Sequence, residues 1–244
     1  MQAIWANWPV NNIKAFTTTR KGGVSKFPFA SFNLAQHVGD NIFHVEKNRQ
    51  LLIEYFNLPS APLYLNQIHS TSVISLPYTK KNIDADAVYT NQPNQVCAVM
   101  TADCLPLLVT NKEGNEVAAI HAGWRGLCNG IIENTINMFD SARNEIYVWL
   151  GPAISQKAFQ VGEEVREQFV SYNQDAISAF KKDELHNGKY FADLFKLAEQ
   201  RLHALGITNI FGGDHCTFTE NENFFSYRKE KNTGRMLSLI WISK

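Results

Sequence analysis

The sequence predicts an α+β or layered α/β domain. Short apolar segments rich in β-branched residues dominate residues 63–120, whereas helical patterns occur as separate stretches outside that region. This arrangement differs from the regular strand–helix alternation of a βαβ protein. The chain has 244 residues, no internal repeat and no Pro/Gly/Ser linker between domains, so we expect a single domain over residues 1–244.

The N-terminal part of the chain is expected to contain one strand and one helix. Residues 13–19 (IKAFTTT) have the composition of a strand, which Gly22 and Gly23 end. Residues 43–57 place apolar side chains among charged ones at spacings typical of an amphipathic helix, which ends before Pro59.

Six strands are expected in the middle of the chain, separated by turn residues. They are LYL (63–65), SVISL (72–76), DAVYT (86–90), VCAVMT (96–101), LPLLVT (105–110) and EVAAIH (116–121).

Helices and strands are both expected in the C-terminal half. A helix should follow the HAGWRG motif, with an apolar face formed by Leu127, Ile131, Ile132, Thr135, Ile136 and Phe139. Two more helices are expected at 162–171 and 191–205, the second capped by Gly206. The remaining strands are EIYVWL (145–150), ITNIF (207–211), FFSYR (224–228) and RMLSLIWIS (235–243).

Composition excludes several classes of protein. The formal net charge is zero and the pI is about 7.0, which argues against nucleic-acid or membrane-surface binding through a basic field. No apolar run is long enough to span a membrane, and the N-terminus lacks a signal-peptide pattern, so a cytoplasmic location is expected. The four cysteines show no paired spacing, which argues against a disulfide scaffold and a zinc ribbon.

Three residues have the chemistry of a catalytic metal site. His69 in NQIHS, Cys104 in TADCLPLL and His121 in HAGWRG each lie at the end of an expected strand. One thiolate and two imidazoles suit zinc or copper, and three protein ligands leave a fourth position open. The same residues fit a second interpretation, in which Cys104 is a nucleophile with His121 or His69 as its base.

The sequence indicates anion-binding and substrate-binding residues less clearly than it indicates the metal site. Arg20 precedes a glycine turn in TTRKGGVS, and Arg125 lies near the start of a helix in HAGWRG; either could hold phosphate, or be an ordinary solvated cation. Arg228 in FFSYR is a third such cation. The amides of Asn33 and Gln67 lie beside these motifs and fit either a base or ribose hydroxyl or a turn cap.

Taken together, these motifs resemble those of the YfiH-like family, long labelled polyphenol oxidase or laccase-domain proteins. The matching stretches run in family order from about residue 14 to residue 241. They are TTRKGGVS, SFNLAQHVGD, NQIHS, DADAVYT, TADCLPLL, HAGWRG, GPAISQKAFQVGEEV and DHCTFTENENFFSYRKEKNTGR.

The resemblance implies a fold, a chemistry and a set of site residues. The fold is a layered α/β/β/α arrangement of mixed sheets flanked by helices. The chemistry is metal-dependent phosphorolysis of adenosine, inosine and methylthioadenosine, with deamination of adenosine. The family's zinc ligands correspond to His69, Cys104 and His121, and its motif arginines to Arg20, Arg125 and Arg228.

On this hypothesis the substrates are purine nucleosides and phosphate, and the cofactor is zinc, with copper as the alternative. In deamination, a zinc-activated hydroxide would attack C6 of adenine. Asp103, the nearest carboxylate in sequence to a ligand, is the expected acid/base, although strand alternation would turn it to the opposite face from Cys104. In phosphorolysis, the arginines would hold the phosphate that attacks C1′.

Other functions remain open from the sequence. A multicopper laccase needs many histidine ligands, whereas this chain has seven histidines and no H-x-H pair. Copper-supported phenol oxidation at the three-ligand site, a cysteine hydrolase using Cys104, and a role in peptidoglycan precursor editing are the enzymatic alternatives. A non-catalytic module that binds a nucleoside or a cell-wall fragment is the non-enzymatic one.

Overall fold

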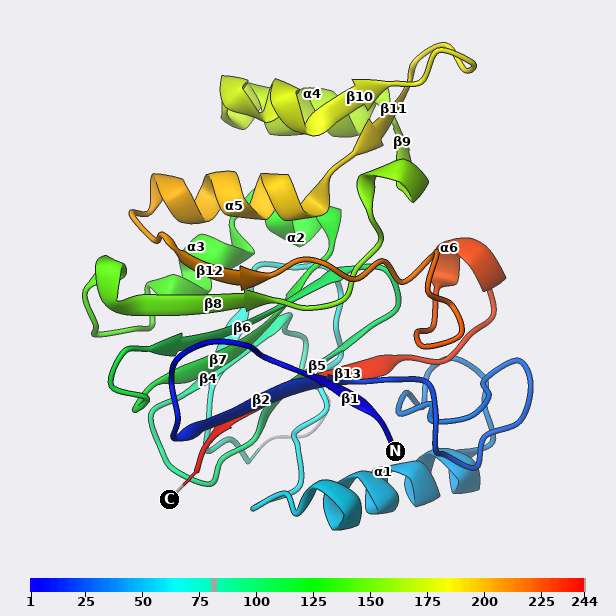
Figure 1. The fold of residues 1–244 in the computed structure, drawn as a ribbon, viewed down its shortest axis with the longest axis vertical. Helices are drawn as coiled ribbons and strands as arrows, with labels where there is room; N and C mark the ends of the chain where they lie inside the picture. The colour runs from blue at the N-terminus through cyan, green and yellow to red at the C-terminus, as the bar shows by residue number, and fades with distance from the viewer. Residues whose placement is uncertain (80–82, 244) are drawn as a thin grey trace.

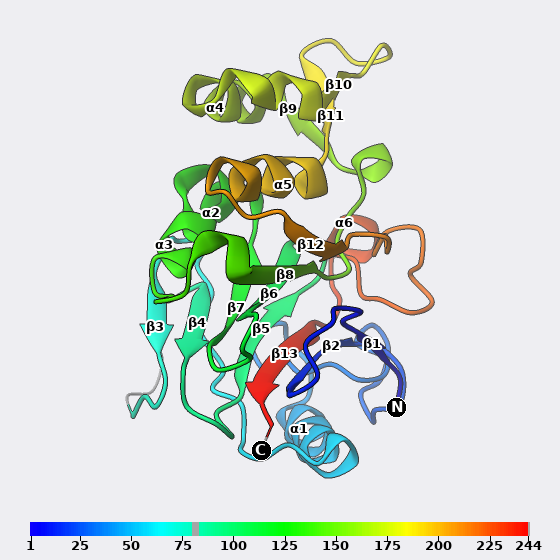
Figure 2. The same cartoon turned by 60° about the vertical axis from the view of Figure 1, so that its left-hand side comes forward.

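The protein folds into four layers, helix, sheet, sheet and helix, as the computed structural model shows for residues 1–79 and 83–243 (Figure 1). The predicted α+β class with an α/β/β/α arrangement is therefore confirmed. Seen from a second direction, the same order of layers runs from α5 through the two sheets to α1 (Figure 2). Among the described residues, no helix combines the length and apolarity that crossing a membrane requires.

The larger central sheet has six strands in the order β12-β8-β6-β7-β4-β3. The two outer pairs, β12–β8 and β3–β4, are parallel, and the inner pairs are antiparallel. Its strands are β3 (Val73–Ser75), β4 (Ala87–Thr90), β6 (Leu105–Asn111), β7 (Val117–Ala122), β8 (Ile146–Leu150) and β12 (Asn209–Gly212). Every residue of β6 and β7 is buried, which explains their nearly continuous apolar sequences.

The second sheet has four antiparallel strands and packs face to face on the first. Its order is β1-β2-β13-β5, with β1 (Ala3–Trp5), β2 (Ile13–Thr18), β5 (Cys97–Thr101) and β13 (Met236–Ile242). Side chains of both sheets meet in one apolar cluster, which includes Val99 and Ile240 from the second sheet and Leu108 and Ala119 from the first. This cluster is the core between the sheets.

Helices cover the two outer faces. α1 (Ile42–Phe56) packs on the four-stranded sheet, where Leu52 meets Phe16 and Leu239. The six-stranded sheet is covered by α2 (Trp124–Asn129), α3 (Ile131–Ile136) and α5 (Leu194–Ala204). Both views place α4 (Glu163–Tyr172) beyond α5, together with a small sheet of β9 (Gln160–Gly162), β10 (Phe180–Lys182) and β11 (Lys189–Ala192) (Figures 1 and 2).

Four of the expected elements are wrong or altered. Residues 63–65 form no strand, and residues 224–228 lead instead into α6 (Tyr227–Glu230), because the Ser226 hydroxyl accepts the backbone N–H of Lys229 as a helix N-cap. The helix expected after HAGWRG is broken into α2 and α3 at Gly130, which has a left-handed φ of 101°. The helix expected at 191–205 begins only at Leu194, because residues 189–192 form β11.

Candidate metal centre and its cavity

Three side chains from distant parts of the sequence converge at one end of the six-stranded sheet. His69 lies in the loop before β3, Cys104 in the turn between β5 and β6, and His121 in β7. Their ligand atoms all lie within 4.8 Å of one another, and Cys104 Sγ is 3.7 Å from His69 Nε2. In the β6–β7 pair Pro106 is opposite His121, so strand register brings the turn before β6 beside the end of β7.

A fully buried carboxylate, Asp86, orients two members of this cluster. Its Oδ1 atom accepts hydrogen bonds from His121 Nδ1 at 2.7 Å and from the backbone N–H of His69 at 3.0 Å. Its Oδ2 atom accepts the backbone N–H and the hydroxyl of Ser70, at 2.6 and 2.7 Å. A neutral His121 that donates Nδ1–H to Asp86 keeps the lone pair of Nε2 free, as a metal ligand requires.

The electrostatics of the cluster favour a thiolate. Burial by itself would raise the pKa of Cys104, but the charge of His121 and hydrogen bonds from His121 and His69 lower it to about 6. Burial likewise opposes the charge on His121, but the thiolate and Asp86 raise its pKa to about 9. These shifts favour a thiolate–imidazolium pair in the metal-free protein, and a metal ion bound there would replace the proton on His121.

The backbone around the cluster leaves no spare room. A Cβ on Gly123 would lie 2.4 Å from His69 Cδ2 and 3.2 Å from Cys104 Sγ, so the strand-to-helix connection passes directly behind the ligands. His69 itself has a φ of 60°, in the left-handed region that few non-glycine residues occupy. Close approach and an unusual backbone conformation at one place are typical of a functional site.

The cluster lines a cavity of about 420 Å³, together with Gln67, Met100 and Thr101 among others. The sequence left Gln67 open as a reader of a base or ribose hydroxyl or as a turn cap, and in the structure its amide bonds to backbone. It donates to the carbonyl of Met100 at 2.8 Å and accepts the N–H of Met100 at 2.7 Å. Gln67 thereby ties the loop that carries His69 to the edge of β5.

The cavity is also lined by three residues that the sequence analysis did not single out: His37, Tyr227 and Arg235. Within the described chain, the His37 imidazole makes no hydrogen bond to protein, and burial together with Arg235 and Arg49 lowers its pKa. The Arg235 Nη1 atom donates to the carbonyls of Thr233 and Gly234, at 2.9 and 3.0 Å.

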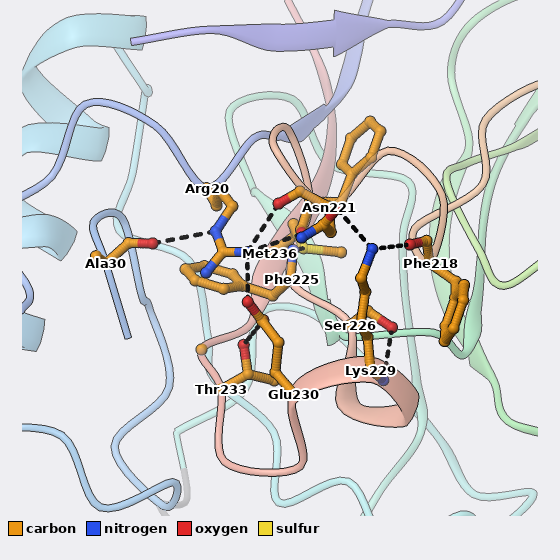
Figure 3. A network of polar contacts seen from close by, with 12 residues as sticks. Arg20, Ala30, Phe218, Asn221, Phe225, Ser226, Lys229, Glu230, Thr233 and Met236 are labelled. Carbon is orange, nitrogen blue, oxygen red and sulfur yellow. Dashed lines mark hydrogen bonds and ion pairs between the residues drawn. The ribbon is translucent and has the colours of Figure 1, made fainter. Parts of the chain in front are cut away.

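Arg20 does not line the cavity. Its Nη1 atom donates to the carbonyl of Asn221 at 2.8 Å and to the carboxylate of Glu230 at 2.9 Å, and its Nε donates to the carbonyl of Ala30 (Figure 3). Its guanidinium also lies over the ring of Phe225, 4.6 Å from the centroid. These contacts join the loop after β2 to the loop before α6 and to α6 itself, so Arg20 supports the helix that carries Tyr227 of the cavity lining.

Asp103 and Arg228 are also engaged with the protein. The carboxylate of Asp103 accepts the Thr217 hydroxyl and the backbone N–H of Arg228, both at 2.6 Å, and lines no part of the cavity. These bonds hold the turn that presents Cys104 against the start of α6. The guanidinium of Arg228 points elsewhere, and donates to the carbonyl of Gln160 at 2.9 Å.

The last two predicted site residues lie outside the cavity. Arg125 is exposed on α2 and stacks on its neighbour Trp124, 4.3 Å from the ring centroid. Asn33 is fully buried, and its amide bonds only to other parts of the protein. The structure thus brings together the three predicted ligands and Gln67, and separates them from the predicted arginines.

The fold and the site define this protein as a layered α/β/β/α protein with a Cys/His₂ cluster at one end of its central sheet. The family model described as multi-copper polyphenol oxidoreductase laccase matches residues 14–243. The chain is 59% identical over 242 residues to a purine nucleoside phosphorylase of Haemophilus influenzae, covering 99% of each. It is 53% identical over 239 residues to the Escherichia coli K12 purine nucleoside phosphorylase YfiH, covering 96% of each.

Solved structures agree with these sequence matches. The crystal structure of a Neisseria meningitidis protein superposes with a TM-score of 0.94 at 44% identity, covering 100% of both chains. That of the Bacillus licheniformis hypothetical protein YfiH gives a TM-score of 0.89 at 29% identity, covering 95% of this chain and 93% of that one. The chain belongs to the YfiH-like family.

Proposed function

We propose that this protein is a metal-dependent purine nucleoside phosphorylase that acts on adenosine, inosine and methylthioadenosine. The observation that carries the proposal is the Cys/His₂ cluster in a cavity of about 420 Å³, a size typical of small-molecule sites. The names of the relatives from Haemophilus influenzae and Escherichia coli support the same reaction.

The donor set fits a zinc ion. His69, Cys104 and His121 supply two imidazoles and one thiolate, the soft and borderline donors that zinc prefers, and three protein ligands leave one position open to the cavity. Copper binds the same donors. When bound, the ion supplies a Lewis acid beside the substrate.

Arg235 and His37 are the residues that we assign to the phosphate end of the cavity. Arg235 lines the cavity, and within the described residues its guanidinium is hydrogen-bonded through Nη1 alone, to two backbone carbonyls. A guanidinium presents five N–H donors, so the others can bind phosphate oxygens. The neutral imidazole of His37 offers one donor and one acceptor beside it.

The reaction then follows from this arrangement. A phosphate oxygen forms a bond to C1′ of the ribose while the C1′–N9 bond breaks, and the electron pair leaves with the purine, which takes up a proton. The ribose carries positive charge in the transition state, so a phosphate held in place by Arg235 both stabilises that charge and supplies the nucleophile. Deamination of adenosine is a second reaction that we assign to the same cluster.

A turnover assay with and without inorganic phosphate tests this function. Zinc-loaded protein should convert inosine to hypoxanthine and ribose 1-phosphate only when phosphate is present, and Cys104→Ala should abolish the reaction while the protein stays folded. Equal cleavage in phosphate-free buffer would mean hydrolysis instead. Undiminished turnover by metal-free Cys104→Ala would overturn the metal site as its source.

Phenol oxidation is the alternative that the description of the family model favours. A multicopper oxidase needs several metal sites, whereas the part of the chain that the structure describes contains one Cys/His cluster of three or more ligands. Copper-loaded protein should therefore oxidise phenols much more slowly than zinc-loaded protein cleaves nucleosides. A faster phenol oxidation would reverse this assignment.

A further inference from the structure

We propose that Asn33 is a positioning residue, which holds His37 and Arg235 together as one phosphate-binding wall. The inference rests on the proposed function, because it takes the phosphate end of the cavity from that proposal. It assigns to Asn33 an indirect role, whereas the sequence left open a direct substrate contact or a turn cap.

The amide of Asn33 makes four hydrogen bonds and has no exposed atoms. Its Oδ1 atom accepts the backbone N–H of Ala35 and the backbone N–H of Arg235, both at 3.0 Å. Its Nδ2 atom donates to the carbonyl of Ala35 at 3.0 Å and to Oδ2 of Asp40 at 2.9 Å. One side chain therefore fixes both ends of the loop 35–40, which carries His37, to the segment that carries Arg235.

The contact with the Arg235 segment is close as well as polar. A Cβ on Gly234 would lie 2.9 Å from Cβ of Asn33, so the two segments pack without a gap between them. The Arg235 guanidinium bonds to the carbonyls of Thr233 and Gly234. Its orientation therefore depends on the backbone of residues 233–235, which Asn33 fixes through the Arg235 N–H. A shift of this backbone relative to the His37 loop would separate the two phosphate-binding groups.

The variant Asn33→Asp tests this coupling with almost no change in volume. It keeps the acceptor for Arg235 N–H, but it places a carboxylate oxygen where Nδ2 now faces Asp40 at 2.9 Å and the Ala35 carbonyl at 3.0 Å. Two carboxyl groups at this separation either repel or share one proton, and a single O–H cannot replace both bonds that Nδ2 now donates, so the loop loses at least one of them. We expect the Kd for inorganic phosphate, measured by calorimetry, to rise about tenfold, with zinc content unchanged.

The chain offers a matched control in Asn111, a buried asparagine at the opposite end of β6 from Cys104. Its Nδ2 atom also donates to a carboxylate, that of Glu116, at 3.1 Å. Asn111→Asp introduces the same repulsion and a comparable loss of stability, but its Kd for phosphate should stay within about twofold of the wild type.

A reciprocal exchange provides the rescue. In Asn33→Asp/Asp40→Asn the donor and the acceptor trade places, so the hydrogen bond between the two positions is restored and the phosphate Kd should return to within about threefold of the wild-type value. If Asn33→Asp does not fold, Asp40→Asn alone leaves one acceptor oxygen for the donors that both oxygens of Asp40 now serve, adds no charge, and should weaken phosphate binding by a smaller factor.

These measurements separate the two proposals. An unchanged phosphate Kd in Asn33→Asp, an equal loss in Asn111→Asp, or no recovery in the double variant would overturn the positioning role. A wild type that binds phosphate but does not cleave inosine would overturn the proposed function alone, and the comparison of Kd values would still test Asn33. A wild type that binds no phosphate at millimolar concentration would overturn both.

Discussion

The Nδ1 atom of His121 lies 2.7 Å from Oδ1 of Asp86, and the same oxygen accepts the backbone N–H of His69. One buried carboxylate thus sets the ring orientation of one expected ligand and the backbone position of another. Because Asp86 holds the Nδ1–H of His121, Nε2 is the ring nitrogen left for a metal ion, which would displace the proton from Nε2 on binding.

Replacing Asp86 should weaken metal binding without removing a ligand. We expect Asp86→Asn to lower zinc affinity about 10- to 100-fold, the range found for carboxylates behind histidine ligands, in a competition titration with a chelator. Asp84→Asn is the matched control, since Asp84 lies two residues away, is exposed and bonds to Asn66. Equal zinc affinity in wild type and Asp86→Asn would show that this carboxylate does not serve the metal site.

The thiol of Cys104 should react as a thiolate in metal-free protein. Because its pKa is lowered from 9.0 to about 6, its alkylation rate should rise with pH through about 6 and level off above pH 7. Iodoacetamide labelling followed by peptide mass spectrometry measures this, with buried Cys97 as an internal reference whose pKa burial raises. Zinc should protect Cys104, and a midpoint near 9 would contradict the thiolate–imidazolium pair.

Gly123→Ala should disrupt the cluster through sterics alone. The added methyl group would lie 2.4 Å from His69 Cδ2, so the imidazole must move away from the other ligands. We expect zinc affinity to fall at least about tenfold. In a His69→Ala background the same change should have little further effect, because the clashing ring is gone; additive losses would mean that Gly123 acts on the other ligands.

Arg20 and Arg235 should differ in what their loss affects. Arg20→Ala removes hydrogen bonds to Asn221 and Ala30 and an ion pair with Glu230, and should cost about 2 kcal/mol of unfolding free energy in urea titrations. Its KM for phosphate should stay near the wild-type value. Arg235→Ala should instead raise the KM for phosphate about tenfold or more. If Arg20→Ala raised the KM for phosphate and Arg235→Ala did not, phosphate binding would have to be assigned to Arg20.

The three candidate ligands were predictable from sequence because each occupies a short motif, although His69 lies in a loop and only Cys104 and His121 lie at strand ends. His121 and Cys104 are brought together by strand register, which the apolar pattern of β6 and β7 largely determines. Asp86 was missed although it lies in the DADAVYT motif, because the motif holds two carboxylates, Asp84 and Asp86, and does not by itself show which of them is buried. A carboxylate directly before a strand that pairs with the ligand-bearing strand is the signal that would have found it.

The phosphate end could not be predicted in the same way. Tertiary contacts decide where a long arginine side chain points. The motif TTRKGGVS therefore gave no indication that the Arg20 guanidinium would bond to Asn221 and Glu230. Arg235 is the last residue of the stretch DHCTFTENENFFSYRKEKNTGR, and nothing in that stretch distinguishes it from the other cations there. The helix α6, which brings Tyr227 to the cavity, was predicted as a strand because the aromatic residues before it favour β structure. The helix is only four residues long, and its N-cap, Ser226, lies inside the segment that was predicted as a strand.

X-ray absorption at the zinc edge of the zinc-loaded protein tests the central claim most directly. If His69, Cys104 and His121 hold the ion, the spectrum should contain one sulfur at about 2.3 Å and two imidazole nitrogens at about 2.0–2.1 Å, with one ion per chain. The sulfur shell should disappear in Cys104→Ser. A zinc environment of oxygen and nitrogen alone in the wild-type protein would contradict the account.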